Sequence, residues 1–66
     1  MREYRRHLGR RVLLHLDGAT LDGVLVRADR DTVALREARM LSALEPSDMD
    51  GELIVERVAL VWMQVV

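Results

Sequence analysis

The stretch RVLLHLDGATLDGVLVRA, residues 11–28, decides the fold of this 66-residue chain. Its first six residues alternate with the period of a β-strand, and one face is apolar, made by Val12, Leu14 and Leu16. The Asp-Gly pair at 17–18 is a strong signal for a tight turn between two strands. Residues 20–28 continue as the second strand, so the stretch predicts a β-hairpin.

Gly23 interrupts the second predicted strand. Inside a strand, glycine usually marks a bulge, a sharp bend or the close approach of another backbone. A strand bent at Gly23 can serve both halves of a small barrel. Short strands with turn signals at close spacing therefore predict a mainly all-β fold, a strongly bent five-stranded antiparallel barrel behind a short N-terminal α-helix.

The other elements are predicted from similar signals. Residues 1–8 can form a short helix that stops at Gly9, and further strands are expected at 32–38, 52–58 and 59–66, with a loop at 46–51. Residues 33–45 are ambiguous, because they are rich in Ala, Leu, Arg, Glu and Met, which favour helix. A helix there would give a mixed α+β fold, and the residue pattern leaves both readings open.

Self-association is expected from the size and composition of the chain. A chain of this length buries only roughly 60% of its unfolded surface. The absence of cysteine excludes disulfides, and two histidines are too few to suggest a structural metal. Residues 58–66, VALVWMQVV, carry Gln64 as their one polar side chain, a composition that pairs with other strands. Another copy of the chain is therefore expected to cover this segment.

Positive charge is concentrated at the start of the chain, although the formal net charge is −1. Residues 1–11 carry five arginines and one glutamate, whereas residues 12–66 carry five arginines and ten acidic residues. Such a basic segment attracts nucleic acid when several copies combine their fields. The other reading is a solvated helix whose arginines pair with acidic residues of the barrel.

Residues 9–38 and 51–65 together resemble the Sm-like family, which includes the LSm proteins and bacterial Hfq. The shared pattern is a short helix, a glycine, a V-x-L strand, the turn at 17–18, a Gly-x-Leu at 23–25, Asp29 in the next loop and Leu35 in the third strand. Two strands that almost abut follow at Ile54–Met63. Each motif is common, so the resemblance depends on their joint order and spacing.

The resemblance implies one Sm-like domain over residues 1–66, with the helix at 1–9 and an SH3-like barrel at 10–66. It favours a long strand over a helix at 33–45. It also implies a homo-oligomeric ring, a hexamer or heptamer, in which the fourth strand of one copy pairs with the fifth strand of the next. Residues expected at this interface are Leu60, Trp62 and Val65.

The resemblance further implies binding of single-stranded RNA by two loops that surround the ring pore. The corresponding loop residues here are Asp29, Arg30, Asp31, Thr32 and Arg57. Asp31 occupies the position of the stacking aromatic of Hfq, and Glu56 occupies that of the LSm arginine. Thr32 is the polar residue nearest to the missing LSm asparagine. Acidic side chains disfavour a polyanion, so uridine recognition at the pore is not favoured.

The basic N-terminal helix is therefore the preferred RNA surface. Its candidate contacts are Arg2, Tyr4, Arg5, Arg6 and Arg10, with arginine for phosphate and tyrosine for base stacking. The expected function is RNA binding by a ring that chaperones or recruits RNA. The alternative is an oligomeric scaffold or protein-interaction module that binds no nucleic acid, as in a phage or accessory operon.

No catalytic, metal or cofactor site is expected. The sequence has no cysteine nucleophile, no histidine pair at metal-ligand spacing and no glycine-rich phosphate loop, so it does not resemble an enzyme. No apolar run approaches the about 20 residues of a membrane span. No apolar core follows the basic start, as it would in a secretory signal, and a cytoplasmic location is expected.

Overall fold

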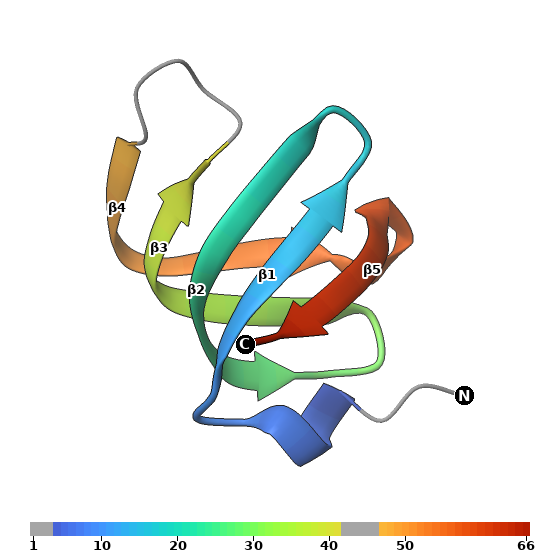
Figure 1. Cartoon of the computed structure of the whole chain (residues 1–66). Helices are drawn as coiled ribbons and strands as arrows, with labels where there is room; N and C mark the ends of the chain where they lie inside the picture. Colours follow the sequence, from blue (N-terminus) through green and yellow to red (C-terminus); the bar gives the residue numbers. More distant parts are fainter. Residues whose placement is uncertain (1–3, 42–46) are drawn as a thin grey trace.

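A computed structural model of the chain describes residues 4–41 and 47–66 and shows a strongly bent, five-stranded antiparallel sheet (Figure 1). A short 3-10 helix precedes the sheet, and a second one joins its last two strands. In chain order the elements are η1 (Tyr4–His7), β1 (Arg11–Leu16), β2 (Ala19–Ala28), β3 (Thr32–Met40), β4 (Ser47–Glu56), η2 (Arg57–Ala59) and β5 (Leu60–Val65). The predicted all-β fold with a short helical start is confirmed.

β1 and β2 form the predicted hairpin. Leu16 lies opposite Ala19 across the turn. Gly18 in this turn has a φ of 80°, a left-handed conformation that glycine adopts without steric cost. Val12 and Leu14 are fully buried, because alternate residues of β1 face the core.

Gly23 marks a bend, as predicted. A Cβ atom at this position would lie 3.0 Å from the Cβ of Leu35 and 3.1 Å from the carbonyl oxygen of Arg36. The β2–β3 pairing shifts register between Asp22 and Val24 at this point. The missing side chain therefore lets β3 approach β2 closely where the sheet curves.

The segment that the sequence leaves ambiguous is a strand up to Met40. β3 pairs with β2 on one side and with β4 on the other, which excludes a helix over these residues. Val33 and Leu35 are fully buried, and Ala38 is 1% exposed. The last part of the ambiguous segment, 42–45, and Pro46 of the predicted loop lie outside the described residues.

β4 begins earlier than predicted, which corrects the loop expected at 46–51. The Asp50-Gly51 pair forms a bulge inside the strand, because Glu52 pairs with Arg36 and Met49 pairs with Ala38. Two residues of β4 therefore lie opposite Glu37 alone. Gly51 and Glu37 have φ values of 77° and 51°, so both strands take a left-handed conformation here. Asp50 and Gly51, which have the composition of a turn, therefore kink β4 instead of ending it.

The helix expected at 1–9 is a single 3-10 turn, Tyr4–His7, in the part that the structure describes. Gly9 follows with a φ of 83° and donates its N–H to the carbonyl of Leu25 at 2.7 Å. The N–H of Leu25 in turn donates to the carbonyl of Arg10 at 3.0 Å. These two bonds attach the chain after η1 to β2.

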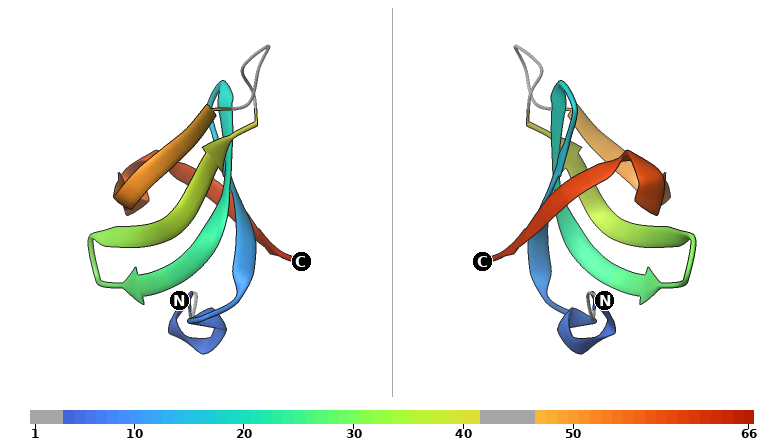
Figure 2. Two further views of the ribbon diagram at one scale, coloured as in Figure 1. Left: turned by 90° about the vertical axis from the view of Figure 1, so that its left-hand side faces the viewer. Right: turned by 90° about the vertical axis from the view of Figure 1, so that its right-hand side faces the viewer.

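Figure 2 shows that β2, β3 and β4 are strongly curved, and the core is formed by side chains of the bent sheet. Its buried members come from all strands except β5: Val12, Leu14, Leu21, Leu25, Ala28, Val33, Leu35, Ala38 and Val55. Residues of β5 pack against this cluster and are only partly buried. The core is therefore closed from one side by the last strand.

The sheet has two free edges. Its strand order is β4-β3-β2-β1-β5, so β4 and β5 lie at opposite ends. β5 uses one edge to pair with β1, with Val12 opposite Val65 and His15 opposite Trp62. Among the described residues, the other edge of β5 and the outer edge of β4 have no strand partner.

Candidate nucleic-acid interface

The β2–β3 loop and η2 meet at one end of the sheet. The backbone N–H of Arg57 donates to the carbonyl of Asp31 at 2.8 Å. Within the loop, the N–H of Asp29 donates to the carbonyl of Thr32 at 2.7 Å, and the Thr32 hydroxyl donates to the Asp29 carboxylate at 3.4 Å. The fold thus brings together the five loop residues predicted from the sequence: Asp29, Arg30, Asp31, Thr32 and Arg57.

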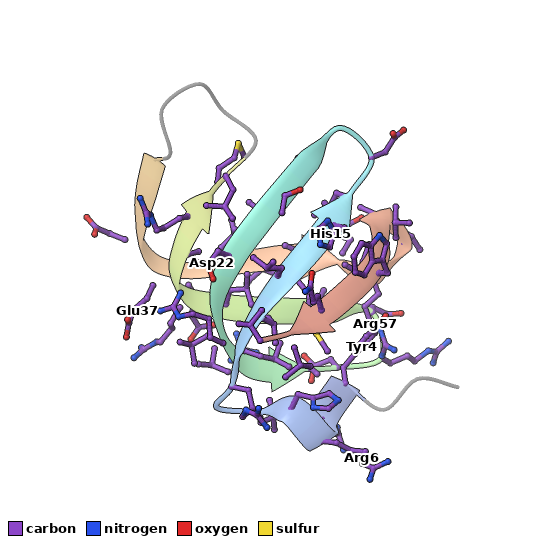
Figure 3. All side chains as sticks on the ribbon, viewed as in Figure 1. Tyr4, Arg6, His15, Asp22, Glu37 and Arg57 are labelled. Carbon is purple, nitrogen blue, oxygen red and sulfur yellow. The ribbon has the colours of Figure 1, made fainter. Side chains whose placement is uncertain are left out.

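Arg57 is engaged by contacts within the chain. Its Nη1 donates to the carbonyl oxygen of Asp29 at 2.7 Å, and its guanidinium carbon lies 4.5 Å from the centre of the Tyr4 ring (Figure 3). Exposed cation–π contacts of this kind contribute roughly 0.5–1 kcal/mol. We call this contact the Tyr4–Arg57 clasp, because it joins η1 to η2 and, through the bond to Asp29, to the β2–β3 loop.

A pocket of about 210 Å³ opens between these loops, and we call it the loop pocket. Its wall includes Val58, whose surface is 92% exposed, and its charged groups belong to two acidic and two basic residues. The complete lining is Arg30, Asp31, Thr32, Glu56, Arg57 and Val58. Val58 is absent from the residues predicted for this site, since a lone valine between two strands carries no recognisable signal.

Only some of the predicted N-terminal contacts are open to a ligand. The Nε of Arg5 donates to the carbonyl of Ala28 at 3.1 Å, so this arginine anchors η1 on β2. Tyr4 is half-buried beneath Arg57. Arg6 and Arg10 are exposed, and Figure 3 shows Arg6 pointing away from the barrel. Arg2 lies outside the described residues.

Acidic residues of the barrel pair with arginines of the barrel. Arg11 contacts Asp22 at 3.1 Å and Glu37 at 3.5 Å, and Arg27 pairs with Glu52. Arg30 lies 3.9 Å from the carboxylate of its neighbour Asp31. Within residues 4–41 and 50–66, none of these pairs involves Arg6 or Arg10. Barrel acids therefore pair with Arg11 of the basic segment 1–11, but they leave Arg6 and Arg10 without an ion pair within those residues.

The predicted interface residues of β5 face two ways. Leu60 and Val65 pack against the core of their own barrel. Trp62 is 46% exposed, as are its neighbour Val61 at 56% and Val66, which follows β5, at 57%. Two of the three residues that the sequence suggested for the interface, Leu60 and Val65, therefore pack within the subunit. The exposed apolar surface of β5 comes from Val61 and Trp62.

His15 and Trp62 form a stack that the sequence does not predict. Their ring centres lie 3.8 Å apart at an interplanar angle of 8°, and the buried Nε2 atom of His15 has no hydrogen-bond partner among the residues that the structure describes. The stack follows from the β1–β5 register, which places the two residues opposite each other. No local sequence pattern encodes that register, and the alternation of residues 11–16 alone indicates a surface position for His15.

Over the described residues, no group of three or more His, Cys, Asp or Glu side chains is arranged to hold a metal ion. The same part of the chain contains no helix that is long and apolar enough to span a membrane.

The chain is similar in structure to archaeal Sm proteins. It superimposes on the Pyrococcus abyssii Sm protein in complex with a uridine heptamer with a TM-score of 0.83 and 23% identity, covering 94% of this chain and 90% of that one. A heptameric archaeal Sm protein matches with a TM-score of 0.82 and 20% identity, over 94% of this chain and 93% of that one. The five-stranded fold is therefore the Sm fold.

A chain of the NatC complex bound to CoA is also similar, with a TM-score of 0.82 and 18% identity over 100% of this chain and 87% of that one. No family model matches the sequence, and no curated protein matches it significantly.

Proposed function

We propose that this Sm-fold chain assembles into a closed homo-oligomeric ring of six or seven copies that binds single-stranded RNA in the cytoplasm. The observation that carries the proposal is the pair of open strand edges at opposite ends of one sheet. An edge of this kind is a template for pairing with another chain. The two edges belong to different strands, β4 and β5, so copies contact each other head to tail. Such contacts form a closed ring when the rotation from one copy to the next adds up to a full turn.

The exposed side chains near both edges support this assembly. Ile54 of β4 is 57% exposed, and Val61 and Trp62 of β5 are 56% and 46% exposed. Burying apolar area stabilises association by roughly 25 cal/mol per Å² before ordering costs. A β4–β5 contact between copies would cover these residues and supply partners for the open backbone groups.

The open arginines support RNA as the ligand. Arg6 and Arg10 have no ion-pair partner in the described part of the chain; Arg6 lies in η1, and Arg10 follows it. In a ring, each copy would contribute these charges to one face, and the combined field would attract a polyanion. The similarity to a Sm protein in complex with a uridine heptamer points the same way.

Native mass spectrometry with and without a heptanucleotide RNA tests assembly and binding together. We expect one ring stoichiometry, with RNA bound to the ring at low salt. The logarithm of the affinity should fall linearly with the logarithm of the salt concentration.

The variant Arg6→Ala should make that slope shallower, because it removes a cation that neutralises phosphate, whereas Arg5→Ala should act chiefly on stability. An affinity that is independent of salt would contradict phosphate binding.

A scaffold that binds no nucleic acid is the second candidate. It is favoured by the acidic side chains Asp31 and Glu56 in the loop pocket and by the similarity to a chain of the NatC complex. The two candidates are separated by the same titration. Rings that bind no U-rich or A-rich oligomer at about 50 mM salt, where phosphate contacts are strong, would establish the scaffold.

A further inference from the structure

The loop pocket presents acceptors and donors in an arrangement that suits one base better than the others. Its rim carries the carboxylates of Asp31 and Glu56, and the guanidinium of Arg30 lies 3.9 Å from Asp31. The side chains of Arg30 and Asp31 are 94% and 86% exposed, so both are free to reach a ligand. Arg57 is already engaged by Tyr4 and by the carbonyl of Asp29.

Carboxylates at the rim select for donor groups on the base. An ionised carboxylate only accepts hydrogen bonds. Uracil presents two carbonyl oxygens on either side of one N–H, so a carboxylate that reaches this N–H also faces two acceptors. Guanine presents N1–H and its 2-amino group side by side, and these two donors can bind both oxygens of one carboxylate.

The guanidinium of Arg30, which neighbours the Asp31 carboxylate, suits the adjacent edge of guanine. Arginine donates in a bidentate manner to O6 and N7 of guanine. O6 lies next to N1 on the guanine ring, so a carboxylate and a guanidinium that lie side by side can bind both edges at once. Adenine and cytosine each offer only one amino donor, with ring acceptors beside it.

The pocket wall provides a surface for the face of the base. Val58 is almost completely exposed, and it lines the pocket. An apolar side chain can contact the face of a base without a stacking aromatic, which this loop lacks. The three features together are an apolar wall, a carboxylate and an exposed guanidinium beside it.

We propose that the loop pocket selects guanine in single-stranded RNA, with Asp31 accepting from N1–H and the 2-amino group and Arg30 donating to O6 and N7. This inference rests on the proposed RNA-binding function and deepens it, because it names the base that the pocket takes. Arg6 and Arg10 supply affinity for phosphate, and the pocket supplies the preference.

Fluorescence anisotropy with labelled heptanucleotides tests the preference on the full chain at about 50 mM salt. The oligomers are U7 and the same sequence with a central guanosine, inosine or adenosine. We expect the guanosine oligomer to bind about tenfold more tightly than U7, in the range of one bidentate base contact. Inosine keeps O6, N7 and N1–H and lacks only the 2-amino group, so it should lose part of that gain, and adenosine should bind like uridine.

Three single variants test which carboxylate is responsible for the preference for guanosine. Asp31→Asn replaces one acceptor oxygen with a donor and should lower the ratio of guanosine to uridine affinity, while the contact of Arg30 with O6 and N7 remains. Asp17→Asn removes the same charge from the exposed β1–β2 turn and should leave the ratio unchanged. Glu56→Gln should raise the affinity for every oligomer, because it removes a negative charge, without changing the ratio. Thermal unfolding should show that all three fold, since the side chains are exposed.

The outcomes separate this inference from the function on which it rests. If no oligomer binds, RNA binding itself is wrong. If all oligomers bind with equal affinity, RNA binding stands and the base assignment is overturned. If Glu56→Gln lowers the preference and Asp31→Asn does not, the assignment to Asp31 is overturned.

Discussion

Glu37 holds a backbone conformation that its side chain disfavours. Its φ of 51° lies in the left-handed region, where a Cβ atom costs roughly 1–2 kcal/mol. We expect Glu37→Gly to raise the free energy of unfolding by about 1 kcal/mol, measured by urea denaturation at fixed protein concentration. The loss of the ion pair with Arg11 matters little, because the Glu37 side chain is 78% exposed.

The matched control is Glu37→Gln, which keeps the Cβ atom and removes the charge. It should leave the free energy of unfolding almost unchanged. If the glutamine and glycine variants gain equal stability, the charge and not the backbone is the source of the effect.

Gly23 is the opposite case, a position where a side chain has no room. A Cβ atom would meet the Cβ of Leu35 and the carbonyl of Arg36, both fixed by the sheet. We expect Gly23→Ala to lower the free energy of unfolding by roughly 1–3 kcal/mol, the usual cost of overpacking. A melting temperature equal to that of the unsubstituted chain would show that β2 and β3 can separate at the bend without loss.

At the scale of elements, the Tyr4–Arg57 clasp joins η1 to the loops. A double-mutant cycle with Tyr4→Leu and Arg57→Met measures the contact between the two side chains separately from their other interactions. We expect a coupling energy of about 0.5–1 kcal/mol by chemical denaturation, the size of an exposed cation–π contact. A coupling energy of zero would mean that η1 is held by its other contacts, which include the packing of Tyr4 against the core, the Arg5 bond to Ala28 and the backbone bonds of Gly9 and Arg10.

The elements whose signals are local could be predicted from the sequence. The β1–β2 hairpin combines strand alternation with an Asp-Gly turn, and both ends of β1 match the prediction. The start of β4 differs from the prediction, because Asp50-Gly51 has the composition of a turn whether it ends a strand or kinks one. Distinguishing the two requires the pairing partner, Glu37 in β3, which local composition does not contain.

The candidate site was only partly predictable for a similar reason. The loop residues could be named from the order of motifs, and the fold does bring them together. The direction of Arg57 toward Tyr4 and the stack of His15 on Trp62 depend on elements distant in sequence. The same holds for Arg5, whose charge suggested phosphate and whose Nε binds the carbonyl of Ala28.

At the scale of the whole molecule, the outer edge of β5 allows the proposed assembly to be tested separately from the folding of the subunit. Val61 is 56% exposed, so Val61→Asp should leave the subunit folded and convert rings to monomers in native mass spectrometry. Val65 packs against the core, so Val65→Asp should unfold the chain, seen as loss of the β-sheet circular dichroism signal. Val26→Asp, on exposed surface of the central strand β2, is the control and should keep the ring. Intact rings of the Val61 variant would show that this edge is not the contact.

The position of β1 between β2 and β5 sets an order of events during folding. β2 follows β1 after a short turn, and hairpins form in about 1–10 μs. β5 comes much later in the sequence, and its return to β1 must first overcome the entropy of closing that long loop. Until it arrives, the second edge of β1 is unprotected, and this interval is when the nascent subunit is most prone to aggregate. Because β5 must pair with β1 before its outer edge is in place, a subunit of the proposed ring has to complete its own sheet before it can pair with a neighbour.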